Sequence, residues 1–198
     1  MRTGTENAIE ITSLARTVLI RFIRPERRNP LSSDVISELE EAVRSVDAQK
    51  VEQLIFSGSG DAFASGADLR EISSLTAASA RTFAKRGQRL MQMIDDLPVM
   101  TVAAINGACF GGGLDLALAC KKRVASPNAV FCHPGVSLGI ITGWGGTQRL
   151  PRLIGESNAL EMLLTADRIS AAEAFRIGLV DQIVDDLAAT ILVDMDSP

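Results

Sequence analysis

The sequence predicts an α/β protein in which short strands alternate with helices. Apolar runs rich in β-branched residues, such as residues 51–56 and 99–105, are each followed by glycine and then by a segment of helical character. The chain has 198 residues, of which 46% are hydrophobic and only 4% aromatic, so it can form one sizeable and mostly aliphatic core. Strands that interleave with helices in this way are typical of α/β architecture.

The composition argues against several classes of partner and site. The formal net charge of −4 disfavours nucleic acid and anionic membrane surfaces. No apolar run approaches the roughly 20 residues of a membrane span. Cys109, Cys120 and Cys132 stand in apolar surroundings without a CxxC pair, and the chain has one histidine. This pattern predicts reduced core cysteines in a cytoplasmic protein and argues against a zinc site.

The N-terminal segment predicts a hairpin, a loop and a helix. Residues 9–11 and 18–23 are short apolar runs on either side of a polar turn. The loop that follows carries three arginines within residues 24–30, a composition typical of solvated surface. Apolar residues then recur at helical spacing to about residue 48, with Ser32 or Ser33 as the N-cap.

A second strand leads into the first of two strand-to-helix junctions. The strand, residues 51–56, ends in a glycine-rich turn, and the junction lies at residues 65–67. Asp68 and Glu71 have the spacing of a capping box, so a helix is expected to begin at Leu69. The first backbone amides of a helix have no partner within it, so they are free to bind something else.

The second junction follows an amphipathic helix, residues 78–96, and an apolar strand, residues 99–105. Glycines at residues 111–113 lead into a short helix at residues 114–120, with Asp115 in its first turn. Glycine lets a ligand approach the backbone, and the helix N-terminus favours an anion or an oxygen that becomes one. The same residues are equally compatible with a packing turn, in which Asp115 only complements the helix dipole.

The rest of the chain continues the alternation. Short strands are expected at residues 121–126, 129–132 and 179–184, with a glycine-rich connection at residues 133–146. Helices are expected at residues 147–153, 157–164 and 171–177, with a partial helix at residues 187–195. The third of these has Ser170 as its cap and Gly178 as its stop.

Motifs for nucleotide binding are absent from the sequence, and serine hydrolysis has little support. Both candidate dinucleotide fingerprints lack the third glycine, which is replaced by Phe63 in one and Leu116 in the other. The glycines at residues 111–113 are not followed by the lysine of a P-loop. His133 is the only histidine that a serine triad could use, which argues against serine hydrolysis.

Two junctions with free backbone donors, and a carboxylate one helical turn from one of them, suit the stabilisation of an enolate or oxyanion next to a carbonyl. Here the sequence resembles the enoyl-CoA hydratase/isomerase, or crotonase, superfamily. The matching blocks follow the family's order along nearly the whole chain. They lie at residues 24–25, 29–31, 62–69, 105–107, 111–116, 146–151, 168–174 and 178–180.

The resemblance implies a spiral of ββα units that binds acyl-CoA thioesters, with coenzyme A as part of the substrate and no separate cofactor. It implies that the amides of Ala67 and Gly112 are the oxyanion-hole donors and that Asp115 is the acid/base. The substrate-binding positions that it implies are Ala64, Gly66, Asp68, Leu69 and Gly111, with Arg27 or Arg28 for the CoA phosphates. It also implies a homotrimer or hexamer formed with the help of C-terminal helices.

Three departures from the family pattern bear on the mechanism. Asp115 stands where the hydratases carry the first of two glutamates, and its side chain is one methylene shorter. Gly135 stands at the second and cannot transfer a proton. His133, two residues earlier and on the same side of an expected strand, is either a substitute acid or a structural histidine. Residues 1–184 are expected to form the core, and residues 185–198 the start of a shortened or truncated C-terminal helical region.

The sequence therefore predicts an acyl-CoA-binding enzyme of hydratase or isomerase type. With one carboxylate, proton shuttling within a thioester enolate fits isomerisation better than the addition of water. The alternative is a catalytically weak or inactive CoA-binding or assembly protein that keeps the fold, which Gly135 and the short C-terminal region motivate.

Overall fold

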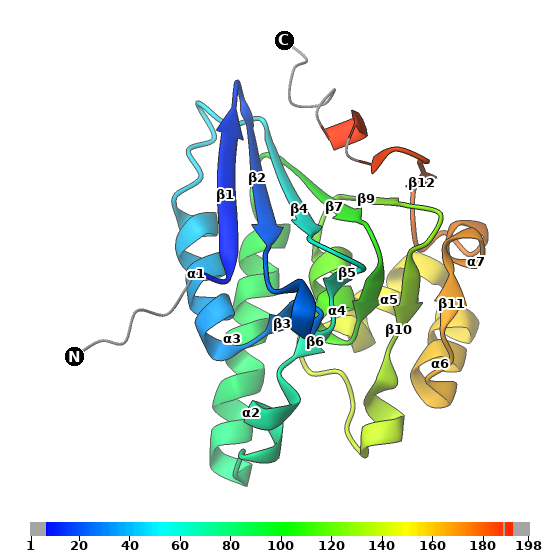
Figure 1. The fold of residues 1–198 in the computed structure, drawn as a ribbon. Coiled ribbons are helices and arrows are strands. Elements are labelled where there is room, and N and C mark those ends of the chain that lie inside the picture. Colours follow the sequence, from blue (N-terminus) through cyan, green and yellow to red (C-terminus); the bar gives the residue numbers. More distant parts are fainter. Residues whose placement is uncertain (1–6, 188, 192–198) are drawn as a thin grey trace.

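The computed structural model describes residues 7–187 and 189–191 and shows strands and helices in alternation (Figure 1). The helices are α1 (Ser33–Arg44), α2 (Leu69–Ser73), α3 (Ala77–Asp95), α4 (Gly112–Ala119), α5 (Gly146–Ile154), α6 (Glu156–Thr165) and α7 (Ala171–Arg176), with 3-10 helices η1 (Pro25–Arg27) and η2 (Pro134–Leu138). The strands are β1 (Ile9–Leu14), β2 (Thr17–Phe22), β3 (Pro30–Leu31), β4 (Gln53–Gly58), β5 (Ala62–Ala64), β6 (Gly66–Ala67), β7 (Met100–Ile105), β8 (Ala108–Phe110), β9 (Lys122–Ala125), β10 (Val130–Cys132), β11 (Ile169–Ser170) and β12 (Gln182–Ile183).

The strands form a large six-stranded sheet, a small four-stranded sheet and a separate pair of strands, β3 and β6. The large sheet has the order β1-β2-β4-β7-β9-β12, with β1 and β2 as the predicted antiparallel hairpin and the other neighbours parallel. The small sheet has the order β11-β10-β8-β5. The chain steps from the large to the small sheet at β4–β5, β7–β8 and β9–β10, and a helical segment follows each step. The α/β class and the expected spiral of ββα units are confirmed.

The main core lies between the large sheet and the helices α1, α3 and α4, which cover one of its faces (Figure 1). Along β4, Leu54 and Phe56 face this core, while Ile55 between them faces the opposite side, as the two-residue period of a strand requires. On that opposite side Leu187 and Ile191 pack against the sheet. The middle strands of the large sheet, β2, β4, β7 and β9, therefore have apolar residues buried on both faces, whereas β1 at its edge is mostly exposed.

Two asparagines hold the turn that ends β4. The Asn106 side chain accepts the Gly58 N–H at 3.0 Å and donates to the carbonyls of Gly60 at 3.0 Å and Ala62 at 3.2 Å. The Asn29 amide donates to the same Ala62 carbonyl at 2.8 Å. These bonds fix where β5 begins, and with it the junction that follows.

Several short strands lie where the sequence suggested loops. The segments β3, β5, β6 and β8 are two or three residues long, and they pair with segments distant in sequence, β3 with β6 and β5 with β8. Two or three residues carry no periodicity, so distant partners rather than local pattern decide their conformation. The helix η2, within the connection at residues 133–146, was likewise not predicted.

The C-terminal part differs from the sequence expectation at one strand. The expected strand at residues 179–184 is wrong in length, because only β12 pairs with β9. The Leu179 N–H instead donates to the Ala174 carbonyl at 2.8 Å and closes the end of α7. Of the helix expected at residues 187–195, Leu187 and residues 189–191 are helical, and the others lie outside the described residues.

The three cysteines are buried and free of disulfides, as expected: Cys109, Cys120 and Cys132. None of the described helices combines the length and the apolar character that a bilayer span requires.

Candidate active site

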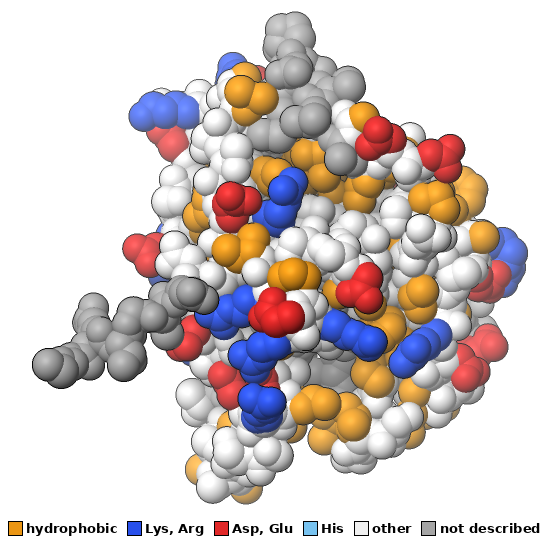
Figure 2. Space-filling view, viewed as in Figure 1, with side chains coloured by type: hydrophobic (Ala, Val, Ile, Leu, Met, Phe, Trp, Pro, Cys, Tyr) orange, Lys and Arg blue, Asp and Glu red, His pale blue; other side chains and the backbone are white. Residues whose placement is uncertain are grey.

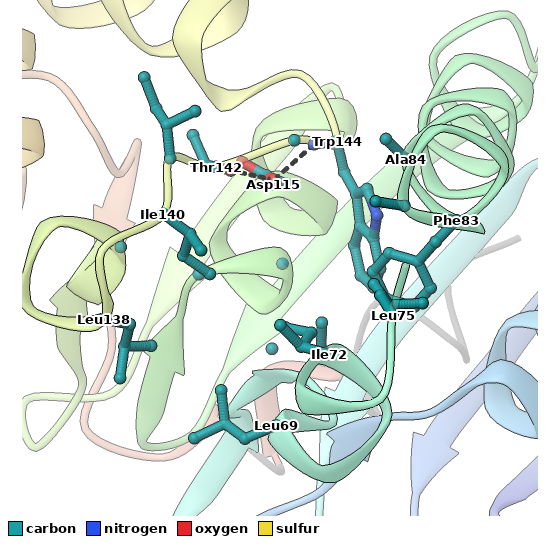
Figure 3. Close-up of a pocket in the computed structure, with 18 of the residues that line it drawn as sticks. Leu69, Ile72, Leu75, Phe83, Ala84, Asp115, Leu138, Ile140, Thr142 and Trp144 are labelled. Carbon is teal, nitrogen blue, oxygen red and sulfur yellow. Dashed lines mark hydrogen bonds between the residues drawn. The ribbon is translucent and has the colours of Figure 1, made fainter. Parts of the chain in front are cut away.

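A cavity of about 410 Å³ opens beside α4, and it contains most of the residues singled out from the sequence (Figure 3). Its walls come from the β6–α2 junction, from α3, from the start of α4 and from the segment at residues 133–144. Apolar side chains point into it from three of these elements, as Figure 3 shows for Leu69, Ile72, Phe83 and Ile140. A concave, largely apolar space with a few convergent polar groups is the usual form of a small-molecule site.

The first junction places the Ala67 backbone at the cavity wall. Gly66 has φ +94°, a conformation that other residues rarely adopt. Asp68 caps α2 as expected, accepting the Arg70 N–H at 2.8 Å. The expected capping box is wrong in part, because the Glu71 carboxylate does not accept the backbone N–H of Asp68.

Glu71 caps another helix instead. Its carboxylate accepts the backbone N–H of Ser33, at 3.0 and 2.9 Å from its two oxygens, and the Ser33 hydroxyl at 2.7 Å. Ser33 is the first residue of α1, so this contact both satisfies the start of α1 and ties α2 to it. Ser32 is the N-cap residue of α1, yet its side chain makes no capping bond.

The second junction brings the Gly112 backbone next to Ala67. Gly111, with φ 49° and ψ −119°, is the N-cap of α4, and Gly112 is its first residue. A Cβ built on Gly66 would lie 2.9 Å from the Gly112 nitrogen, and one built on Gly112 would lie 3.3 Å from the Ala67 nitrogen. The two backbone amides therefore lie side by side at the cavity, and a side chain at Gly66 would crowd the amide of Gly112.

Asp115 lies in the first turn of α4, at the back of the cavity, with only 1% of its surface exposed. Its Oδ2 accepts hydrogen bonds from the Thr142 hydroxyl and from the Trp144 N–H, the latter at 3.3 Å (Figure 3). Burial raises the pKa of Asp115 from 3.8 to about 6, and the bonds from Thr142 and Trp144 oppose that shift. A carboxyl group with a pKa in this range can take up and release a proton near neutral pH.

His133 lies against the same carboxylate. Its Nε2 is 3.7 Å from Asp115 Oδ1, too far for a hydrogen bond, and neither ring nitrogen has a hydrogen-bond partner in the described part of the chain. Burial lowers the pKa of His133 to about 4, so the ring is neutral at physiological pH. A neutral imidazole with a depressed pKa is a poor proton donor.

The expectation that His133 and Gly135 share one side of a strand is wrong. His133 follows the last residue of β10 and precedes η2, and Gly135 lies within η2. A Cβ built on Gly135 would lie 2.7 Å from the Ile140 carbonyl oxygen, and Ile140 donates its N–H to Gly135 at 3.0 Å. Glycine is therefore required at position 135, because the backbone of Ile140 leaves no space for a Cβ atom.

Trp144 closes the cavity from the side of α3. Its indole is 3% exposed and contacts the Phe83 ring, with 5.5 Å between the centroids. A Cβ built on Gly87 would lie 2.2 Å from the indole, and one built on Gly112 would lie 2.4 Å from it. The ring is therefore wedged between α3 and α4, and neither helix has space for a larger residue at its contact.

The predicted site residues divide into two groups. The structure brings Gly66, Ala67, Leu69, Gly111, Gly112 and Asp115 together at one cavity. Three others lie outside the cavity lining. Ala64 is buried in β5, and Arg27 pairs with Asp68 at 2.8 Å, with Arg28 exposed beside it. Figure 2 shows basic side chains gathered on the face over β3 and β6, with acidic ones among them.

Sequence reasoning missed the groups that surround Asp115. Thr142, the Trp144 backbone and Gly146 all contact or crowd its carboxylate, and a Cβ built on Gly146 would lie 2.2 Å from Asp115 Oδ1. The available signal was the cluster of glycines at residues 143–146, which indicates a chain that passes close to another element.

Comparisons with known proteins show which family the chain and its fold are similar to. The family model "Enoyl-CoA hydratase/isomerase" matches residues 14–192. The chain is 47% identical over 163 residues to a crotonyl-CoA hydratase of Syntrophomonas wolfei, covering 81% of this chain and 63% of that relative, so it spans less than two thirds of its length. An enoyl-CoA hydratase structure from Bacillus anthracis matches with a TM-score of 0.90 and 35% identity, covering 96% of this chain and 76% of the other. The Pseudomonas aeruginosa DspI structure matches with a TM-score of 0.91 and 32% identity, covering 97% and 80%.

Proposed function

The chain belongs to the enoyl-CoA hydratase/isomerase family, and from that premise we propose that it binds an acyl-CoA thioester and acts on it as a hydratase- or isomerase-type enzyme. The proposal depends on one observation above all. The amides of Ala67 and Gly112 lie side by side at the wall of the cavity that contains Asp115. Two adjacent backbone donors are suited to the oxygen of a thioester, on which negative charge develops when an enolate forms.

Asp115 supplies the acid/base step in this proposal. Its carboxylate receives a proton from the carbon next to the thioester carbonyl. The electron pair of the broken C–H bond forms the C–C double bond of the enolate, and the carbonyl π pair moves to the thioester oxygen. The same proton returns to a different carbon, so the double bond shifts and no atom is gained or lost. Gly135 has no side chain to hold a second proton, which favours this shift over the addition of water by two carboxylates.

The acyl chain occupies the apolar part of the cavity. Leu69, Ile72 and Phe83 point into it, and Leu138 and Ile140 lie across from them (Figure 3). Burial of apolar surface against these side chains stabilises the bound thioester by roughly 25 cal/mol for each Å² removed from water. The lining favours hydrocarbon acyl groups over charged ones.

Coenzyme A enters as part of the substrate, along the β6–α2 junction. Its adenine and pantetheine are assigned to the backbone of Gly66, Asp68 and Leu69, with Gly111 beside the thioester, whereas Ala64 is fully buried and would have to be uncovered to contact the ligand. The basic face over β3 and β6 suits the CoA phosphates (Figure 2), and Arg27, exposed in η1 just before β3, is the residue assigned to them.

A substrate panel tests the proposal. Enoyl-, 3-enoyl- and dienoyl-CoA thioesters are offered to the wild type and to Asp115→Asn, which keeps the shape of the side chain but cannot accept a proton. We expect turnover of at least one thioester by the wild type and a loss of about 10²–10⁴-fold in the variant. An equally active Asp115→Asn protein would contradict the assigned acid/base.

The second candidate function is a CoA-binding or assembly protein that has kept the fold and lost the chemistry. The observation that favours it is Gly135, where the close return of Ile140 excludes any side chain. Micromolar binding of acyl-CoA by calorimetry, without turnover of any member of the panel, would support it. Failure of a folded sample to bind acyl-CoA at millimolar concentration would exclude both functions.

Self-association is part of the proposal. Leu160, Leu164 and Phe175 are exposed on α6 and α7, and large apolar side chains left in water favour contact with another subunit. We expect a homotrimer or hexamer by light scattering, and a monomer at micromolar concentration would contradict this.

A further inference from the structure

The Asp115 carboxylate has almost no open side toward a substrate. One of its oxygens, Oδ1, lies against Gly146 and is 3.7 Å from His133 Nε2. The other, Oδ2, is covered by the Thr142 hydroxyl and the Trp144 N–H. A group that exchanges protons with a substrate must come within hydrogen-bond reach of it. In this chain the carboxylate is also one methylene shorter than the glutamate it replaces.

Thr142 lies beside this carboxylate at the cavity wall and is the more exposed of the two residues. Its side chain is half-buried and lines the cavity wall, and its hydroxyl donates to Asp115 Oδ2 (Figure 3). A hydroxyl both donates and accepts hydrogen bonds, so it can pass a proton along a chain of such bonds. Thr142 is thus a polar side chain that both lines the cavity and bonds the more deeply buried carboxylate.

The segment that carries Thr142 is held on both sides. The Gly143 carbonyl accepts a hydrogen bond from Gln88 Nε2 on α3 at 2.7 Å. Ile140 donates its N–H to the Gly135 carbonyl at 3.0 Å. These bonds fix the backbone next to Thr142, so the hydroxyl is oriented before a ligand arrives.

We propose that the Thr142 hydroxyl is a catalytic group that relays the proton between the bound acyl-CoA thioester and Asp115. The inference rests on the proposed function and names the route that the proton takes. As the substrate C–H bond breaks, its electron pair forms the enolate and Thr142 Oγ receives the proton. The original hydroxyl proton passes at the same time to Asp115 Oδ2. Reversal of both transfers at another carbon completes the double-bond shift and restores both residues.

The alternative is that Thr142 only keeps Asp115 ionised. Its hydrogen bond lowers the pKa of that carboxyl, as does the charge of Arg149 on α5, while the neighbouring His133 is neutral and Cys109 is a buried thiol. Under this alternative the loss of the hydroxyl would raise the pKa of Asp115 and nothing else. High pH would then ionise Asp115 again and restore activity.

The experiment compares Thr142→Val with Thr142→Ser. Valine keeps the shape and removes the hydroxyl, whereas serine keeps the hydroxyl. We expect Thr142→Val to lower kcat by about 100-fold or more with little change in KM, and the loss to persist to pH 9; Thr142→Ser should stay within about 10-fold of the wild type. Thr147→Val, the same change at a residue of α5 outside the cavity lining, is the matched control and should leave kcat unchanged.

The outcomes separate the relay from the function on which it rests. Thermal unfolding and acyl-CoA binding establish that Thr142→Val is folded and has an intact cavity. A wild type that turns over no thioester overturns the proposed function and the relay together. If the wild type is active and Thr142→Val is equally active, the relay alone is overturned. The same holds if Thr142→Val loses activity at neutral pH and recovers it at high pH.

Discussion

The two strand-to-helix junctions each contribute one backbone amide to the cavity, but they are built in opposite ways. The α4 junction is buried, and added Cβ atoms at Gly112 and Gly113 would lie 2.4 Å from the Trp144 ring and 2.2 Å from the Ala64 carbonyl oxygen. The α2 junction leads into a five-residue helix that has no buried residue. It is held by polar contacts, from Glu71 to Ser33 and from Arg27 to Asp68.

The difference shows how one pair of donors can include an amide whose position is fixed and another whose position can adjust to a ligand. At α4 close packing fixes the amide of Gly112, because interiors at native density do not tolerate shifts. At α2 the helix that follows Ala67 depends on partly buried hydrogen bonds and a partly exposed ion pair, each of which contributes little. We therefore expect substitutions at α4 to change the chemistry, and substitutions at α2 to change ligand affinity.

The largest effect is expected for Gly112→Ala. The new Cβ would strike the wedged Trp144 indole and displace the amide donor, so turnover should fall about 10²–10³-fold. Gly87→Ala presses on the same indole from α3 without touching the donor, and it is the matched control. Both variants should lose about 1–3 kcal/mol of unfolding free energy through overpacking. Equal turnover in the two variants would place the ligand elsewhere.

The buried pair Asp115 and His133 should give stability two opposing dependences on pH. Between about pH 4 and 6 the folded protein holds the Asp115 proton that the unfolded chain loses at 3.8, so this contribution to stability is present in acid and is lost as pH rises through about 6. His133, with a pKa lowered from 6.5 to about 4, acts the other way, and stability falls as pH drops through that interval.

Variants of each residue separate the two contributions. Each amounts to about 3 kcal/mol, from a shift of roughly two units. Relative to the wild type, Asp115→Asn should make the unfolding free energy rise more steeply from pH 4 to 6, and His133→Gln should make it fall. Urea unfolding at several pH values provides the measurement, and slopes that change in the same direction would contradict the assignment.

A smaller effect is expected at the α2 junction for Glu71→Ala. Loss of the carboxylate removes the cap of α1 and should cost about 1 kcal/mol of unfolding free energy. Because α2 is then tied less firmly to α1, acyl-CoA should bind several-fold more weakly while kcat stays unchanged. Glu41→Ala, an exposed change on the same helix α1, provides the control. A large fall in kcat would mean that α2 is not the adjustable side of the cavity.

The smallest effect is expected for Arg27→Gln. The ion pair with Asp68 is partly exposed, so its loss should change the unfolding free energy by less than about 1 kcal/mol. If Arg27 meets the CoA phosphates, acyl-CoA binds more weakly in the variant, and added salt reduces the difference. An acyl-pantetheine thioester, which lacks the nucleotide phosphates, should bind both proteins equally. A change for both ligands would assign Arg27 to the junction rather than to the phosphates.

The long elements and the carboxylate could be predicted from the sequence because their signals are local. The helix expected at residues 78–96 is observed as α3, and the strand at residues 51–56 as β4, shifted by two residues. Asp115 was placed correctly in the first turn of its helix, because glycines, leucines and alanines mark that turn. The side-by-side position of Ala67 and Gly112 was anticipated through family resemblance, since no local pattern reports a distance between two loops.

The surroundings of Asp115 could not be predicted because they come from chain that is distant in sequence. Thr142 and Trp144 bond its carboxylate although they lie 27 and 29 positions later in the sequence. The connection that carries them has neither helical nor strand periodicity. Glu71 was assigned to its own helix because a capping box is a local motif, yet its partner Ser33 lies 38 positions earlier. Burial and pairing of this kind depend on the assembled fold.

The hydrogen bonds of the Asn106 side chain bear on how the protein folds and unfolds. Asn106 follows β7, in the unit formed by β7, β8 and α4, but its side chain bonds Gly58 and Ala62 in the preceding unit, which contains β4 and β5. Strand β4 also pairs with β7. A unit of this spiral is therefore complete only when the next one has formed, unlike a solenoid repeat, whose ends can fray one at a time. Folding must close long loops before these contacts form, which makes it slow and cooperative. The Gly58 amide should accordingly exchange its hydrogen with solvent only when the whole molecule opens.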